Sequence, residues 1–281
     1  MSFPRLIDGL SEIACDHDAL ICDIWGVVHN GQAPFPEAAE ALRHFRRERG
    51  PVVLLSNAPR PSWSVEAQFR RIGVATDCYD AIVTSGGAAQ ADLKARLEKA
   101  GRLSLYYIGP EQDAAVLEGL AITRTGIDQA DVALCVGLVD DLRETPADYA
   151  DILQAMRARK LPMLCANPDL KVYRGSILCW CAGALAEAYE AIGGPVTYYG
   201  KPYKAIYDVA LKAANSPKQA LAVGDALVTD LKGAKAAGLE ALFIADGLHG
   251  EEIEPYTAQH LGEMFAAAGV GAKAAMRALA W

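Results

Sequence analysis

The sequence has no surplus of basic residues. Its 27 lysines and arginines stand against 35 aspartates and glutamates, which gives a formal charge of −8 over 281 residues. A protein that binds nucleic acid usually carries a basic patch. The local arginine cluster between Arg43 and Arg49 fits the solvated face of a helix. We therefore expect no nucleic-acid partner.

Long apolar runs are also missing. No window approaches the run of about 18 apolar residues that a membrane-spanning helix needs. Acidic residues recur between Met1 and Cys22, which is unlike a signal peptide. The seven cysteines are an odd number, and they lie in apolar segments without partners at metal-ligand spacing. We expect a cytoplasmic protein with buried, unbridged thiols and no membrane contact.

What the sequence does contain is a regular alternation of short apolar runs and helical patterns. This alternation predicts an α/β fold, a doubly wound parallel sheet with helices on both faces. The predicted strands are 19–28, 52–57, 81–85, 104–108, 132–136, 163–167, 196–199, 220–225 and 241–245. The predicted helices are 36–48, 64–71, 88–98, 112–119, 146–159, 183–192, 205–214 and 230–237.

The C-terminal segment is rich in alanine. Its composition predicts one further helix over 264–279. We expect this helix to serve core packing or an interface such as that of a homodimer.

Polar side chains follow several of the predicted strands. Asp23 ends the first apolar run, Ser56 and Asn57 end the second, and Asp225 ends a later one. In open α/β sheets, ligands bind outside the carboxyl ends of the strands. We therefore expect these side chains to share one site.

The residue types suit the transfer of a phosphoryl group. A carboxylate can attack phosphorus, and a hard divalent cation held by carboxylates offsets phosphate charge. Asp225 and Asp230 lie five apart across a strand-to-helix turn, so both can face the site. Lys201, between Gly200 and Pro202, is a candidate for binding phosphoryl oxygens.

Four segments, in order along the chain, resemble the motifs of the haloacid dehalogenase superfamily. They are Asp23–Val27, Leu55–Ala58, Gly200–Pro202 and Gly224–Asp230. The resemblance covers nearly the whole chain and implies magnesium as the cofactor. It implies Asp23 as nucleophile, Ser56 and Asn57 on phosphate, Lys201 on the phosphoryl group, and Asp23, the Trp25 carbonyl, Asp225 and Asp230 around the metal.

The segment between the second and third motifs is long and contains Asn167-Pro168-Asp169. It resembles the cap of the type II-capped branch, which includes para-nitrophenyl-phosphatases, nucleotide monophosphate phosphatases and pyridoxal phosphatases. The resemblance implies a core of 1–98 and 196–281 and an inserted α/β cap of 99–195. Residues 167–184 would face the substrate, with Asn167 and Asp169 as binding residues.

Trp25 departs from the pattern of this family. Its phosphatases normally carry a second aspartate two residues after the nucleophile, which protonates the leaving group and then activates water. Tryptophan can do neither, although its backbone carbonyl can still bind magnesium. His29, otherwise read as an exposed turn histidine, and Asp169 are candidate substitutes for the missing acid.

The sequence thus predicts a magnesium-dependent phosphohydrolase that acts on a small phosphorylated metabolite through an aspartyl-phosphate, slowly because of Trp25. Two alternatives stay open. The superfamily's metal-free dehalogenases carry an aromatic residue at this position, but they lack the carboxylates corresponding to Asp225 and Asp230. A phosphatase that has lost catalysis and binds a phosphorylated ligand would tolerate Trp25, but it would have no need of Asp23.

Overall fold

The computed structural model describes residues 3–174, 177–247 and 253–281. Its contacts divide the chain into two compact units. The first comprises residues 1–56, 66–83 and 201–281, and the second comprises residues 57–65 and 84–200. Residues 175–176 of the predicted substrate-facing stretch lie outside the described residues.

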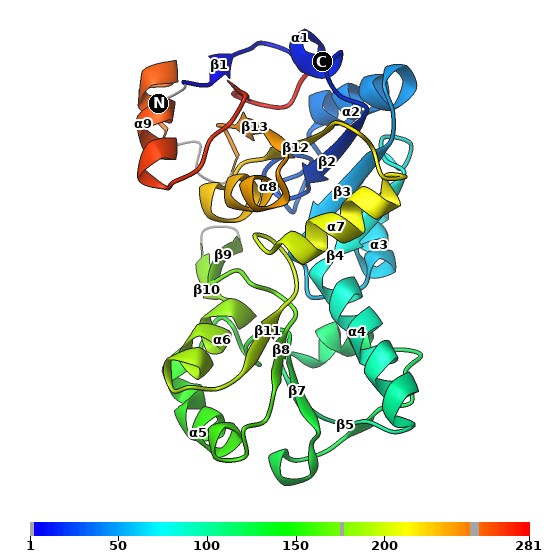
Figure 1. The fold of residues 1–281 in the computed structure, drawn as a ribbon, viewed down its shortest axis with the longest axis vertical. Coiled ribbons are helices and arrows are strands. Elements are labelled where there is room, and N and C mark those ends of the chain that lie inside the picture. The colour runs from blue at the N-terminus through cyan, green and yellow to red at the C-terminus, as the bar shows by residue number, and fades with distance from the viewer. Residues whose placement is uncertain (1–2, 175–176, 248–252) are drawn as a thin grey trace. The chain divides into compact units, whose positions relative to one another are not determined.

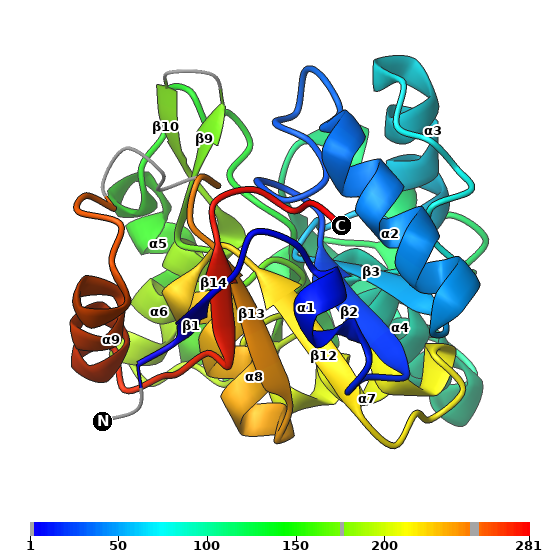
Figure 2. The same cartoon turned by 90° about the horizontal axis from the view of Figure 1, so that it is seen from above.

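The first unit is built on a seven-stranded sheet in the order β1-β14-β13-β12-β2-β3-β4 (Figures 1 and 2). From β1 through β3, each neighbouring pair of strands in this order is parallel. The strands are β1 (Arg5–Leu6), β2 (Ala19–Asp23), β3 (Val52–Ser56), β4 (Ala81–Thr84), β12 (Ala220–Gly224), β13 (Glu240–Ile244) and β14 (Ala274–Met276).

Helices lie against this sheet. Helices α2 and α7 contact β3, and α8 contacts β13. The helices are α1 (Ser11–Ala14), α2 (Pro36–Glu48), α7 (Lys204–Ala213), α8 (Lys232–Ala237) and α9 (Ala258–Ala267), and α3 (Ser62–Ile72) is shared by both units. The predicted doubly wound α/β class is confirmed.

Local sequence explains the elements that lead to the strand ends. Every residue of β2 is buried, as expected for an apolar run in a parallel sheet covered on both faces. Helix α2 begins with Pro36 in its first turn, where a missing N–H costs nothing. It buries Leu42 and Phe45 among other apolar residues of one face. The predicted bounds of this helix are confirmed.

The second unit contains a five-stranded parallel sheet in the order β11-β8-β7-β5-β6. The strands are β5 (Ser104–Ile108), β6 (Thr123–Arg124), β7 (Val132–Cys135), β8 (Met163–Cys165) and β11 (Val196–Tyr198). The helices are α4 (Ser85–Ala100), α5 (Ala150–Ala158) and α6 (Ala182–Ala191). One apolar cluster includes residues of α5 and α6, and another includes residues of α4.

An antiparallel pair of strands, β9 (Lys171–Arg174) and β10 (Ile177–Trp180), also belongs to the second unit. The sequence did not predict this pair. The sequence also placed residues 57–65, 84–98 and 196–200 in the core, whereas the contacts assign them to the second unit. The assignment of a catalytic core and a cap remains a proposal.

Three expectations need correction or adjustment. The C-terminal helix over 264–279 is wrong: α9 ends at Ala267, and β14 follows. Gly269, in the left-handed region at φ +66°, separates the two elements. The predicted helix at 112–119 is a 3₁₀ helix over Glu111–Leu117. Cys15 is exposed, whereas the other cysteines are buried as predicted.

Among the residues that the structure describes, no helix combines the length and the apolar character that crossing a bilayer requires.

The strand assignment at the C-terminus can be tested by two aspartate substitutions. Ala275 is fully buried between β13 and β1, whereas Ala278 is exposed. We expect Ala275→Asp to lower the free energy of unfolding by more than about 2 kcal/mol, because it buries an unpaired carboxylate. Ala278→Asp should stay within about 0.5 kcal/mol of the wild type. Equal effects in urea denaturation would contradict β14.

Candidate active site

Asp23 is the last residue of β2, and its neighbours in the sheet are β3 and β12. Because these strands run parallel, their carboxyl ends meet at one edge. Ser56 is the last residue of β3, and Asp225 directly follows β12. All three side chains are buried. The ends of β2, β3 and β12 thus bring Asp23, Ser56 and Asp225 to one edge of the first unit, whereas Asn57, the residue after β3, belongs to the second unit.

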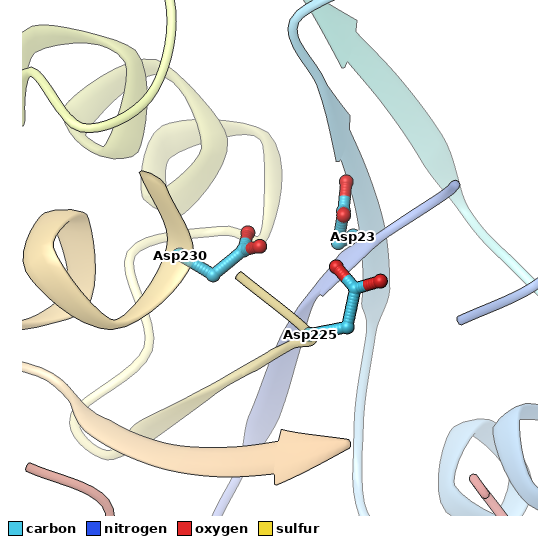
Figure 3. A group of neighbouring side chains, drawn as sticks. All are labelled: Asp23, Asp225 and Asp230. Atoms are coloured by element: carbon cyan, nitrogen blue, oxygen red, sulfur yellow. The ribbon is translucent and has the colours of Figure 1, made fainter. Parts of the chain in front are cut away.

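Three carboxylates gather at this edge. Asp23, Asp225 and Asp230 each offer an oxygen, and these oxygens all lie within 4.8 Å of one another. Figure 3 shows the three side chains grouped around the end of β2. Asp230 reaches the group from a turn of π-helix, Leu227–Leu231, where its Oδ2 accepts a hydrogen bond of 3.2 Å from the backbone N–H of Ala226.

Lys201 binds two of these carboxylates. Its Nζ lies 2.5 Å from Oδ1 of Asp23 and 2.7 Å from Oδ1 of Asp230. The lysine is only 3% exposed, so both ion pairs are shielded from water. Burial alone would lower the pKa of Lys201, but the two carboxylates raise it well above its ordinary value. Lys201 is therefore a fixed positive charge next to Asp23.

The charges at this site do not balance. Burial, and then the negative charge of Asp230, raises the pKa of the Asp23 carboxyl well above its ordinary value, while Lys201 opposes the rise. One ammonium group cannot neutralise the cluster of three carboxylates. Oxygen donors with an excess of negative charge suit a hard divalent cation. The residues present therefore fit a magnesium-type ion.

Two glycines allow the backbone to approach these carboxylates closely. A Cβ on Gly224 would overlap the Asp230 side chain, and one on Gly247 would overlap the Asp225 carboxylate. Sequence reasoning missed Gly247. The Asp246-Gly247 pair after β13 was the available signal, because such a pair often marks a tight turn at a strand end.

The predicted substrate-binding residues other than Ser56 lie together in the second unit. The Asn57 amide donates a hydrogen bond of 2.8 Å from Nδ2 to Oδ1 of Asp169. Oδ1 of Asn57 accepts a bond of 3.3 Å from the Ser85 hydroxyl. The backbone N–H of Asp169 donates to Oδ1 of Asn167 over 3.0 Å. Asn57, Asn167 and Asp169 thus form one group, and Ser85, which the sequence did not single out, belongs to it.

Trp25 packs within its own loop. Its ring meets that of His29 edge-on, with centroids 5.1 Å apart and an interplanar angle of 70°. A Cβ on Gly31, which has φ +88°, would overlap the same indole ring. The indole is therefore held by packing against the loop that follows the nucleophile strand.

His29 is not the exposed turn histidine expected from the sequence, because it is fully buried. Phe69 and Trp25 both contact its ring edge-on. Nδ1 accepts a hydrogen bond of 2.8 Å from the backbone N–H of Gly31, so the proton of the neutral ring lies on Nε2. Burial lowers the pKa of His29 to about 4. A neutral, protonated Nε2 is a poor acid and cannot act as a base.

Comparison with known proteins assigns the family. The sequence model described as haloacid dehalogenase-like hydrolase matches residues 20–123, and a second model of HAD-like hydrolases matches residues 198–268. A crystal structure of a haloacid dehalogenase-like hydrolase from Brucella suis 1330 is 37% identical. It matches 98% of this chain and 100% of that chain with a TM-score of 0.84.

Two curated relatives are phosphatases. D-Glycerol 3-phosphate phosphatase of Mycobacterium tuberculosis is 30% identical over 85% of this chain and 66% of that protein. Ribonucleotide monophosphatase NagD of Escherichia coli is 29% identical over 82% of this chain and 88% of that protein. A crystal structure of the mycobacterial glycerol phosphate phosphatase in complex with magnesium is 26% identical. The match covers 89% of this chain and 78% of that chain, with a TM-score of 0.63.

The chain belongs to the haloacid dehalogenase-like hydrolase family. The curated relatives named above are phosphatases.

The burial of His29 predicts a specific dependence of stability on pH. Its folded pKa of about 4 lies below the unfolded value of 6.5, so the unfolded chain binds the proton first. Stability is therefore complete above about pH 6.5 and falls as the pH drops through 4, by about 3 kcal/mol from this group. We expect the free energy of unfolding, measured by urea denaturation, to fall less between pH 7 and pH 4 in His29→Phe than in the wild type, by about this amount. The carboxylates titrate in both proteins, so an unchanged difference would contradict a buried neutral His29.

Proposed function

We propose that this chain is a magnesium-dependent phosphohydrolase that cleaves small phosphorylated metabolites through an aspartyl-phosphate on Asp23. The observation that carries the proposal is the buried group of Asp23, Lys201, Asp225 and Asp230 at the strand ends. A nucleophile, a fixed positive charge and a cation site lie there within reach of one phosphoryl group.

The first half of the reaction uses Asp23 as the attacking group. A carboxylate oxygen of Asp23 forms a bond to phosphorus, and the bond from phosphorus to the ester oxygen breaks. The ester oxygen leaves as an alkoxide or phenolate and takes up a proton. Water then attacks the acyl phosphate, which releases phosphate and restores the carboxylate.

The neighbours of Asp23 stabilise charge during these steps. Lys201 holds its ammonium group against Asp23, where it offsets the charge of the phosphoryl oxygens. Asp230 orients Lys201 through an ion pair of 2.7 Å. The Ser56 hydroxyl, at the end of β3, donates to the phosphoryl group. Magnesium, held by Asp23, Asp225 and the Trp25 carbonyl with support from Asp230, would supply Lewis-acid stabilisation of the same charge.

The substrate class follows from the relatives, which are phosphatases of glycerol phosphate and of ribonucleotide monophosphates. Both are small phosphorylated metabolites. No disulfide joins the cysteines in the part of the chain that the structure describes. Buried thiols of this kind fit a reducing compartment, so we propose the cytoplasm as the place of action.

The two alternatives are less well supported. A metal-free dehalogenase has no use for Asp225 and Asp230, which converge on Asp23 here. A protein that only binds a phosphorylated ligand needs no nucleophile, yet Asp23 is retained with Lys201 against its Oδ1. The intact group therefore favours turnover over binding alone.

The proposal predicts that Asp225→Ala abolishes metal-dependent turnover. We expect hydrolysis of para-nitrophenyl phosphate by the wild type to need magnesium, to stop on chelation and to return when magnesium is added back. Asp225→Ala should lower turnover by at least about 100-fold, because it removes a cation ligand. Its circular dichroism should match that of the wild type.

Asp208→Ala is the matched control, since Asp208 is an exposed carboxylate on α7 that pairs with Lys204. It should keep full activity. Turnover by Asp225→Ala equal to that of this control would refute the assigned site.

The tryptophan at position 25 leads us to expect that turnover depends strongly on the leaving group. Trp25 offers no carboxyl group, and a positioned general acid contributes about 10²–10⁴-fold. An alkoxide needs that proton most and para-nitrophenolate needs it least. We therefore expect Trp25→Asp to raise the rate constant kcat/KM, which covers only the steps up to release of the leaving group, more for glycerol 3-phosphate than for para-nitrophenyl phosphate.

Trp25→Phe controls for packing, because phenylalanine keeps a ring against His29 and Gly31 without adding a carboxyl group. It should raise neither rate. If Trp25→Asp raised both rates equally, or neither, another residue would already supply the proton.

A further inference from the structure

We propose that Asn57, Ser85, Asp169 and Gly200 form a positioning cluster that fixes the backbone from which Ser56 and Lys201 reach the phosphoryl group. This inference rests on the proposed function. It reassigns Asn57 and Asp169, which the motif resemblance placed on the substrate, to positioning residues.

The cluster is held by hydrogen bonds through both ends of one amide. Nδ2 of Asn57 donates to the Asp169 carboxyl group over 2.8 Å, and Oδ1 accepts from the Ser85 hydroxyl over 3.3 Å. Asn57 is 6% exposed and Ser85 is fully buried, so water competes little for these bonds. The amide is thereby fixed in one orientation.

Gly200 completes the cluster by close packing. It has φ +124°, a conformation that side chains rarely adopt. A Cβ at this position would overlap the Ser85 hydroxyl and Oδ1 of Asn57, and it would lie 2.8 Å from Cδ of Pro168. Only glycine therefore lets this backbone lie against the Asn57–Ser85 pair.

Asp169 is itself held from two sides. Its backbone N–H donates to Oδ1 of Asn167 over 3.0 Å, and its carbonyl accepts from the N–H of Gly183 over 3.1 Å. A Cβ on Gly183 would overlap the carbonyls of Pro168 and Asp169. The Asn167-Pro168-Asp169 turn is thus a rigid support that presents one carboxyl oxygen to Asn57.

The cluster bears on the active site because of where its residues lie in the chain. Asn57, Thr84 and Gly200 are three of the four residues of the second unit at which the chain passes from one compact unit to the other, the fourth being Val65. Asn57 is bonded covalently to Ser56, and Gly200 to Lys201. Fixing Asn57 and Gly200 therefore fixes the backbone next to a proposed phosphate donor and next to the lysine that binds Asp23.

An exchange of the two side chains tests this inference. Asn57→Asp sets two carboxyl groups against each other, whereas Asp169→Asn keeps an amide oxygen that still accepts from Nδ2 of Asn57. The double variant restores a donor and an acceptor in the reverse order, and its new carboxylate at position 57 still accepts from Ser85. We expect Asn57→Asp to lower kcat by about tenfold or more, and Asp169→Asn to lower it less. The double variant should return to within about threefold of the wild type.

The comparison of two substrates separates positioning from contact with the leaving group, and the exchange separates it from contact with the phosphoryl group. Positioning of Ser56 and Lys201 affects only the phosphoryl group, so Asn57→Asp should lower kcat/KM by the same factor for glycerol 3-phosphate and para-nitrophenyl phosphate, with little change in KM. Asp128→Asn, an exposed carboxylate of the same unit, is the control for lost charge and should change nothing.

Each outcome is decisive. A double variant no better than the worse single variant, or factors that differ between the two substrates, would overturn the positioning role and assign Asn57 or Asp169 to the substrate itself. The same exchange measured by thermal unfolding should show coupled stabilities, and additive losses would exclude the contact. An inactive wild type would refute the proposed function, and the positioning role would fall with it.

Discussion

The buried ion pairs of Lys201 are the constraint on which the site depends. A buried ammonium group is costly unless carboxylates surround it, and Asp23 and Asp230 satisfy that need at 2.5 and 2.7 Å. The same contacts hold the nucleophile in place before any substrate arrives. With Asp225 added, the negative charge exceeds what one lysine can offset. This excess suits a divalent cation, whose charge would in turn offset that of a phosphoryl group.

The loop after β2 sets the limits of the chemistry. Trp25, His29 and Gly31 pack together so that the indole occupies the side-chain position where related phosphatases carry an acid. His29 is buried and neutral at ordinary pH, so it cannot replace that acid. Asp169, the other candidate, engages its carboxyl group with Asn57. These contacts are in line with the proposal of an enzyme that gives little help to poor leaving groups.

Much of this site was predictable from sequence, because apolar runs identify the buried strands and the polar residues of the site stand at their ends. Asp23 and Asp225 end apolar runs that can only be buried parallel strands, so their convergence followed from topology. Other features depend on partners that no local pattern reveals. Asp169 lies 112 positions from Asn57, and the rings that contact His29 include that of Phe69 in α3. The alanine-rich C-terminus favours a helix by propensity, but pairing with β13 and β1 makes part of it a strand.

The central claim is that Asp23 becomes phosphorylated during turnover. Without a general base at position 25, breakdown of the acyl phosphate should be slow enough for the intermediate to accumulate. The direct measurement is an acid quench during hydrolysis of para-nitrophenyl phosphate, reduction with borohydride, and mass spectrometry of the peptide containing Asp23. The account predicts reduction of Asp23 to homoserine in the presence of substrate and magnesium, and none without substrate. Sustained turnover with Asp23 unmodified, or with the modification on another residue, would contradict it.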